Sequence, residues 1–119
     1  TSEKNIKNFV KKIKNWIIKV LNNYKIESSN DPNNIGIWVK NNNNLEKIAA
    51  IGIRVKKWIA FHGFSLNINV NKKNYNGIIP CGINDKGIAN MSDFINLSNL
   101  NDINEVIISE FKKTFPNMF

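Results

Sequence analysis

The stretch KIAAIGIRV, residues 47–55, alternates apolar side chains with small or charged ones. One face of the expected strand carries Ala49, Ile51, Ile53 and Val55, and the other carries Ala50, Gly52, Arg54 and Lys56. Alternation with a period of two is typical of a strand that turns one face to a core and the other to solvent. The stretch therefore predicts a half-buried strand of an antiparallel sheet.

Strands are also expected on both sides of this stretch. IGIWVK, residues 35–40, precedes it across the polar NNNN of residues 41–44, which predicts a hairpin. A second alternation follows a charged turn at Lys56 and Lys57, with Phe64, Leu66, Ile68 and Val70 opposite Ser65, Asn67 and Asn69. Glycine inside a strand often marks a bulge or the close approach of a ligand, so Gly52 and Gly63 hint at a site. ESSNDPNN, residues 27–34, has the composition of a loop.

Two amphipathic helices flank the predicted strands. Residues 3–22 place apolar side chains at spacings of three and four, namely Ile6, Phe9, Val10, Ile13, Trp16, Ile17, Val20 and Leu21. A last helix is expected to begin near Asp102, because Asp102 and Glu105 have the spacing of a capping box. Its apolar face would carry Ile103, Val106, Ile107, Phe111 and Phe115. The order of elements predicts an α+β fold, a mostly antiparallel sheet with flanking helices.

Composition narrows the class of protein. A length of 119 residues indicates one domain, and a single cysteine excludes an internal disulfide and fits a reducing compartment. No apolar run approaches the roughly 18 residues that span a bilayer, and TSEKNIKNFVKK at the start lacks the apolar stretch of a signal peptide. The net charge of +8 has two interpretations: an acidic partner, or lysines that are simply solvated.

The residues that could carry chemistry are few. Cys81 lies between Pro80 and Gly82, in a turn that would expose its thiol, so it is either a nucleophile or an inert thiol. With His62 as the one histidine, the chain lacks the ligands of a usual zinc site, and it contains no phosphate-binding loop motif. Lys47 opens its strand, and its charge, if held beside Cys81, would lower the pKa of the thiol.

Three segments together resemble one enzyme family. GIWV (36–39), KIAAIGIRVKKWIAFHGFSLNINV (47–70) and GIIPCGI (77–83) are similar, in order, to the octanoyltransferases, the lipoyl(octanoyl) transferase or lipoate–protein ligase B family. The resemblance implies that Cys81 carries an acyl group as a thioester and that Lys47 activates this cysteine and shuttles protons. It implies an acyl-binding site formed by Ala50, Ile51 and Gly52 with Gly63, Phe64 and Ser65, and an orienting role for His62.

The resemblance also implies a reaction and its partners. An octanoyl group would pass from octanoyl-acyl carrier protein through the Cys81 thioester to the lysine of a lipoyl domain, in lipoate biosynthesis and protein lipoylation. No cofactor or metal is expected, because the acyl group arrives activated, and neither nucleic acid nor a membrane is expected as a partner. The implied fold is that of the biotin and lipoate protein ligases, and the implied compartment is the bacterial cytoplasm, or an organelle in a eukaryote.

The sequence departs from the family at its beginning. Family members carry an arginine–glycine–glycine segment and a histidine–glycine–proline–glycine segment before the first helix, and this sequence has neither. We therefore expect residues 1–119 to be the C-terminal part of a single octanoyltransferase catalytic domain. The alternatives are an inactive fragment that only binds acyl carrier protein, a protein like a lipoate or biotin ligase, and, remotely, a small basic nucleic-acid-binding module.

Two features of the folded chain follow from this hypothesis. Lys47 should lie within about 6 Å of Cys81, the range over which one charge strongly shifts the pKa of another group. One face of the sheet near Gly52 and Gly63 should expose an apolar patch of several hundred Å², on the order of those that mark interfaces.

Overall fold

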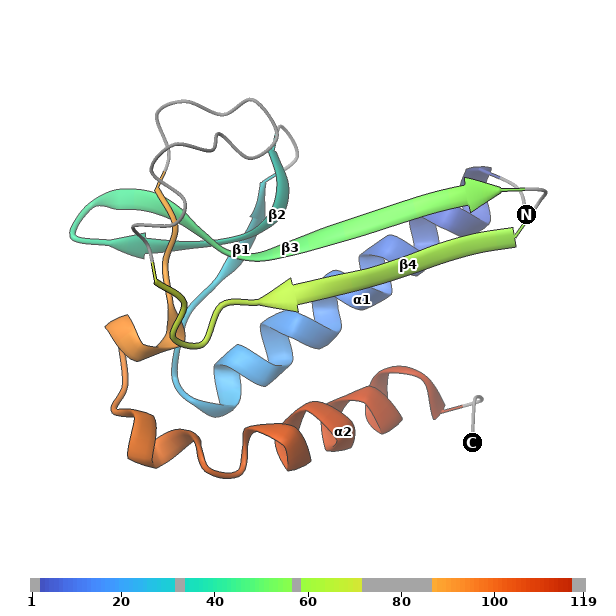
Figure 1. Ribbon diagram of the computed structural model, residues 1–119. Helices are drawn as coiled ribbons and strands as arrows, with labels where there is room; N and C mark the ends of the chain where they lie inside the picture. The colour runs from blue at the N-terminus through green and yellow to red at the C-terminus, as the bar shows by residue number, and fades with distance from the viewer. Residues whose placement is uncertain (1–2, 32–33, 57–58, 72–86, 117–119) are drawn as a thin grey trace.

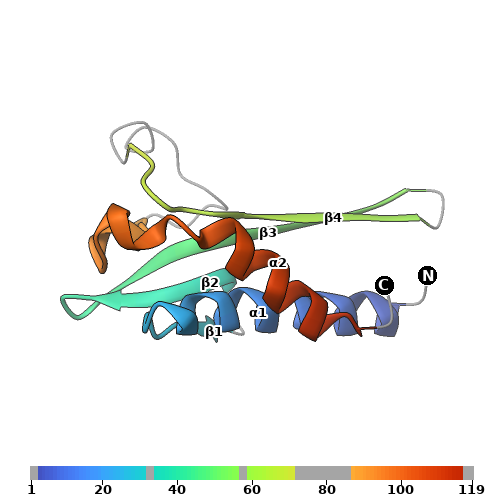
Figure 2. The same ribbon diagram turned by 90° about the horizontal axis from the view of Figure 1, so that it is seen from below.

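The computed structural model describes residues 3–31, 34–56, 59–71 and 87–116. The elements in chain order are α1 (Glu3–Asn23), β1 (Ser29–Asp31), β2 (Asn34–Asn41), β3 (Asn44–Lys56), β4 (Ile59–Leu66), the short 3-10 helices η3 (Met91–Asp93) and η4 (Leu97–Leu100), and α2 (Ile103–Thr114). Helix α1 runs along the long β3–β4 ribbon, with α2 beside it (Figures 1 and 2). The predicted α+β fold is confirmed.

The sheet is an antiparallel meander in the order β1-β2-β3-β4. The predicted hairpin joins β2 to β3 through Asn42 and Asn43, whose φ angles of 52° and 70° lie in the left-handed region that asparagine tolerates. The prediction of a loop over residues 27–34 is wrong in part, because Ser29–Asp31 forms the edge strand β1 against β2. Its polar composition suits an edge strand with one face in water.

The last strand differs from the predicted one in its ends. The alternation of residues 64–70 suggested a strand through Val70, but β4 begins at Ile59 and ends at Leu66. Beyond that point the carbonyls of Asn67 and Ile68 accept hydrogen bonds from the backbone N–H groups of Met91 and Ser92, at 2.9 and 3.0 Å. These residues thus pair with the segment that precedes α2.

The core lies between the sheet and the two helices. Its fully buried members come from α1, β2, β3 and the segment before α2, and include Ile13, Ile17, Leu21, Ile37, Val39, Ile48, Ala49, Ala89, Met91 and Leu100. Trp16 joins three elements: its ring meets Phe64 of β4 edge-on at 4.8 Å and Phe111 of α2 at 4.9 Å. The predicted apolar face of α1 is therefore the face that packs on the sheet.

The start of α2 is fixed by a contact from outside the helix. The helix begins at Ile103, as the pattern predicts, but Asp102 makes no side-chain capping hydrogen bond, so the expected capping box is wrong. Asp102 Oδ1 instead accepts a hydrogen bond of 2.8 Å from the Tyr24 hydroxyl, which follows the end of α1. The carboxylate is therefore engaged in joining the two helices.

This contact predicts a loss of stability at alkaline pH. Burial, and then the hydrogen bond to and the charge of Asp102, raise the pKa of Tyr24 from 10.0 to about 12. Between these values the unfolded chain has released the tyrosine proton and the folded chain still holds it, so the Tyr24 contribution is complete below pH 10 and falls away towards pH 12. Urea unfolding of the parent and of Tyr24→Phe should show this: the difference between their unfolding free energies should shrink across that range. A difference that stays constant with pH would contradict the assignment.

Candidate functional site

A β-bulge in β3 determines which face of the sheet Lys47 occupies. In the β2–β3 register Ile37 is opposite Ala49 but Trp38 is opposite Lys47, so Ile48 is an extra residue without a partner. Directly opposed residues share a face of the sheet, and neighbours along a strand alternate. Lys47 therefore lies on the face of Trp38, and Ala49 lies on the face of Ile37, which packs against the helices.

The bulge makes three consecutive residues buried. Ile48 and Ala49 are both fully buried in the core, and Lys47 is only 8% exposed on the opposite side of the sheet. Beyond the bulge, Ala50 and Gly52 are exposed on that same side. We call the side that carries Trp38, Lys47, Ala50 and Gly52 the outward face. The predicted alternation of the strand is confirmed from Ala49 to Gly52.

The side chain of Lys47 is held between an aromatic ring and a glycine. Its Nζ lies 5.2 Å from the centroid of the Trp38 ring, within the range of a cation–π interaction. Gly36 is buried beside the lysine stem with a φ of +126°. A Cβ at Gly36 would stand 3.0 Å from Lys47 Cε and 2.7 Å from the carbonyl oxygen of Ala49. The space for the stem therefore depends on the absence of a side chain at this position.

The backbone of Lys47 receives the chain that returns to the sheet at Gly87. Lys47 N–H donates to the Gly87 carbonyl at 3.0 Å, and Ala89 N–H donates to the Lys47 carbonyl at 2.9 Å. The Asn90 side chain then bonds both backbone groups of Val70, each at 3.0 Å. Residues 70 and 90 are thus joined side by side, next to the strand that carries Lys47.

The two predicted acyl-binding segments are adjacent in the sheet. The β3–β4 register sets Ala50 opposite Ser65, Ile51 opposite Phe64, and Gly52 opposite Gly63. Ile51 and Phe64 are half-buried and pack against the core. By the pleat of the sheet, the other two pairs belong to the outward face. The six residues therefore divide between a helix-packed layer and an outward floor of small side chains.

The other predicted features lie wholly or partly outside the described residues. Cys81 is among the residues not described, so its distance from Lys47 stays a prediction. His62 is opposite Ile53 in the register of β3 and β4, and its side chain is not described. Ala50 and Gly52 are exposed as expected, but side chains 53–63 are not described, so the size of the apolar patch also stays a prediction.

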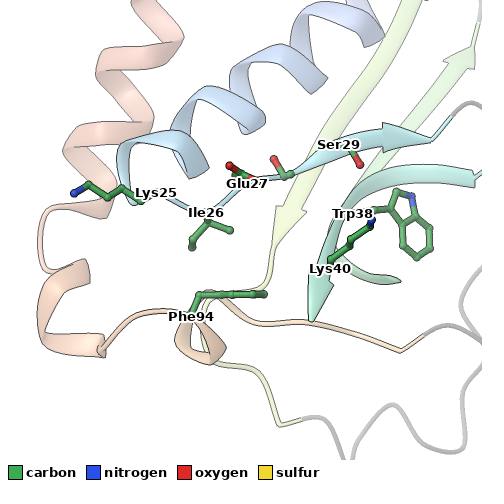
Figure 3. A pocket seen from close by; sticks show the side chains of 8 residues that line it. Lys25, Ile26, Glu27, Ser29, Trp38, Lys40 and Phe94 are labelled. Carbon is green, nitrogen blue, oxygen red and sulfur yellow. The ribbon is translucent and has the colours of Figure 1, made fainter. Parts of the chain in front are cut away.

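A hollow of about 500 Å³ lies at the edge of the sheet, between β2 and the segment after α1 (Figure 3). It is lined by Lys25, Ile26, Glu27, Ser28, Ser29, Trp38, Lys40 and Phe94. None of the catalytic or acyl-binding residues predicted from the sequence lines this hollow. Trp38 belongs both to this hollow and to the surroundings of Lys47. The mixture of cationic, anionic and apolar side chains indicates no single class of ligand.

Among the described residues, no three His, Cys, Asp or Glu side chains are grouped closely enough to hold a metal ion. Among the helices of that part, none has both the length and the apolar character needed to cross a membrane.

The sequence is similar to known proteins over most of its length. Residues 1–112 match the family model of the lipoyl protein ligase A/B catalytic domain. This chain belongs to that family. The sequence is 41% identical over 110 residues to the octanoyltransferase of Wolbachia pipientis subsp. Culex pipiens (strain wPip), an alignment that covers 92% of this chain and 54% of the relative. It is 40% identical over 114 residues to the octanoyltransferase of Ehrlichia chaffeensis, covering 95% of this chain and 53% of the relative.

This family member spans about half the length of the curated relatives it matches; for the octanoyltransferase of Zymomonas mobilis, 39% identical, the share is 49%. The resemblance drawn from the three sequence segments is confirmed. Sequence reasoning gave no role to Gly36 or Trp38, although both stand in the GIWV segment. The available signal was a glycine two residues before a tryptophan, in the strand expected to pair with the strand that carries Lys47.

Gly36 and Gly52 are predicted to respond differently to substitution by alanine. A Cβ at Gly52 would meet nothing within 4 Å, so Gly52→Ala should change the free energy of unfolding by less than about 1 kcal/mol. Gly36→Ala forces a positive φ on an L-residue and crowds the Ala49 carbonyl, so it should cost at least about 2 kcal/mol. Urea unfolding of the two variants tests this, and equal losses would show that the geometry at Gly36 is wrong.

Proposed function

We propose that this chain forms part of an octanoyltransferase in which Cys81 carries the octanoyl group and Lys47 serves as its acid–base partner. The observation that carries the proposal is the position of Lys47: a lysine almost fully buried on the outward face, next to a floor of small residues. The names of the relatives support the reaction class. The donor proposed is octanoyl-acyl carrier protein, and the acceptor proposed is the lysine of a lipoyl domain.

The floor beside Lys47 suits an unbranched acyl chain. Ala50 and Gly52 are exposed, and their partners across the β3–β4 register are Ser65 and Gly63. Small side chains let a ligand approach the backbone closely, as strand glycines often do. The half-buried Ile51 and Phe64 give the sheet rigidity from the other face, where they pack on the core. An eight-carbon chain laid on this floor would leave water for an apolar surface.

Chain connectivity limits the distance between Cys81 and Lys47. The backbone of Gly87 is hydrogen bonded to the backbone of Lys47, and Cys81 lies six positions before Gly87 in sequence. At 3.3–3.6 Å per extended residue, Cys81 is at most about 20 Å from this anchor. This bound is compatible with contact, and the proposal requires contact or a bridging water.

The proposed chemistry conserves the activation of the acyl group. The Cys81 thiolate attacks the carbonyl of the octanoyl thioester, a new C–S bond forms, and the carrier leaves as a thiolate that takes up a proton. The acceptor lysine amine then attacks the enzyme thioester, an amide C–N bond forms, and Cys81 is released. Lys47 would supply the proton in the first step and receive the proton of the attacking amine in the second.

Substitutions at Cys81 and Lys47 test this mechanism in the protein expressed from its complete reading frame. With octanoyl-acyl carrier protein, the parent should gain the mass of one octanoyl group on Cys81, and Cys81→Ser should gain none. Lys47→Ala should slow acylation about a hundredfold or more, because the leaving carrier thiolate loses its proton donor and the Cys81 thiol loses a neighbouring charge. Lys47→Arg should also be slow, because arginine keeps the charge but cannot release a proton.

Each of these variants also has an outcome that contradicts the proposal. An acyl adduct formed by Cys81→Ser on another residue would refute the nucleophile, and transfer by Lys47→Arg at the parental rate would refute the acid–base role. ATP–pyrophosphate exchange that depends on an acyl acid would instead indicate a ligase of the same fold, in which the lysine binds an adenylate.

Enlarging Gly52 should change the preference for acyl-chain length. Valine has space there in the free protein, because a Cβ meets nothing within 4 Å, and it favours a strand. In the proposed site its side chain would occupy the floor used by the acyl chain. Gly52→Val should thus lower the rate with octanoyl donor at least about tenfold while transfer from a butyryl donor changes little. An equal loss with both donors would mean that the chain does not lie over Gly52.

A further inference from the structure

We propose that Gly36 and Trp38 are positioning residues for Lys47: Gly36 leaves the channel in which the lysine stem lies, and Trp38 holds the ammonium over its ring. Their effect on catalysis rests on the proposed function, because it requires that Lys47 act in acyl transfer. Their effect on the position of Lys47 does not. The two can therefore be tested apart.

Gly36 has no side chain, and the space that this leaves is occupied by the stem of Lys47. Its φ of +126° is open to glycine and rarely adopted by L-residues. A Cβ at this position would stand 3.0 Å from Cε and 3.3 Å from Cδ of Lys47. The stem would have to give by a few tenths of an ångström, and the ammonium at its end would move with it.

Trp38 acts through the face of its indole. It stands directly opposite Lys47 in the β2–β3 register and is 1% exposed, and the lysine Nζ is 5.2 Å from its ring centroid. A cation–π attraction strengthens when both partners are shielded from water. The ring face attracts the cation but does not accept its proton, so it holds the ammonium without consuming the proton that the proposed chemistry needs.

The bulge makes this contact available. If Ile48 were paired regularly with β2, Lys47 would share the face of Ala49 and point towards the helices. With the bulge, the lysine faces Trp38 and stays beside the floor formed by Ala50 and Gly52. A displacement on the order of 1 Å of such a group can cost about a hundredfold in rate, so residues that fix the stem have a measurable kinetic effect.

The first experiment measures position without activity. In the protein expressed from its complete reading frame, the ε-methylene protons of Lys47 should resonate upfield of those of exposed lysines, because they lie near the face of an indole ring. Trp38→Leu should return them to the exposed value, and Gly36→Ala should move them towards it. Trp16→Leu is the matched control: it removes a tryptophan from the helix-packed face and should leave the Lys47 resonances unchanged.

The second experiment measures transfer, at a temperature where circular dichroism shows each variant folded. Trp38→Leu and Gly36→Ala should lower kcat about ten- to a hundredfold with little change in KM, since neither residue is proposed to touch the substrate. Trp38→Phe should retain part of the rate, because phenylalanine keeps a ring face that is weaker than that of tryptophan. Trp16→Leu should lose stability and keep its kcat.

A double-mutant cycle separates positioning from general damage. In a Lys47→Ala background, Gly36→Ala and Trp38→Leu should cause no further loss of kcat, while their effects on stability should persist. Losses that simply multiply with that of Lys47→Ala, or an unchanged Lys47 resonance in Trp38→Leu, would overturn the inference. If Lys47→Ala itself transfers octanoyl at the parental rate, the role of Lys47 in the proposed function falls, and the resonances alone still decide whether Gly36 and Trp38 position it.

Discussion

The extra residue Ile48 in β3 is the constraint on which the rest of the structure depends. Before it in the strand, Lys47 lies on the outward face with Trp38. After it, Ala49 lies on the face of Ile37, which packs against the helices. Because the side-chain period of a strand is two, pairing Ile48 regularly with β2 would exchange the faces of everything on one side of it. Either the lysine would enter the core, or the apolar residues that bind β3 to the helices would be turned to water.

The sheet consequently serves two purposes at once. Its helix-packed face carries large side chains such as Phe64, which meets Trp16 edge-on, and these contacts give the fold its stability. Its outward face carries Ala50 and Gly52, which contribute little packing and leave the backbone accessible. The stability of the strand pair thus comes from one side, and the other side is left available for a ligand.

The sequence predicted the regular parts of this arrangement and missed the irregular ones, for physical reasons. Alternation identified β3, and spacing identified both helices, because a period reports which face of an element is buried. The bulge interrupts the period, and three buried residues in succession at 47–49 do not reveal which strand neighbour each one faces. The predicted capping box was wrong for a similar reason, because a contact distant in sequence decides the outcome. Asp102 has the right spacing, but its carboxylate accepts a hydrogen bond from Tyr24. The proposed role of Lys47 came from the resemblance, and its contacts with Gly36 and Trp38 came only from the structure.

Both the backbone and the side chain of Lys47 make specific contacts, and together these contacts fix its position in the sheet. Its N–H and carbonyl pair with Gly87 and Ala89, so the same residue also anchors the segment that begins at Gly87. Its side chain crosses the outward face between Gly36 and Trp38. Any shift of the β2–β3 register would therefore move the ammonium and the anchor together. In the proposed enzyme, a single strand register would set the distance between the two reacting side chains, and the Gly36 channel would set the direction from which the lysine approaches.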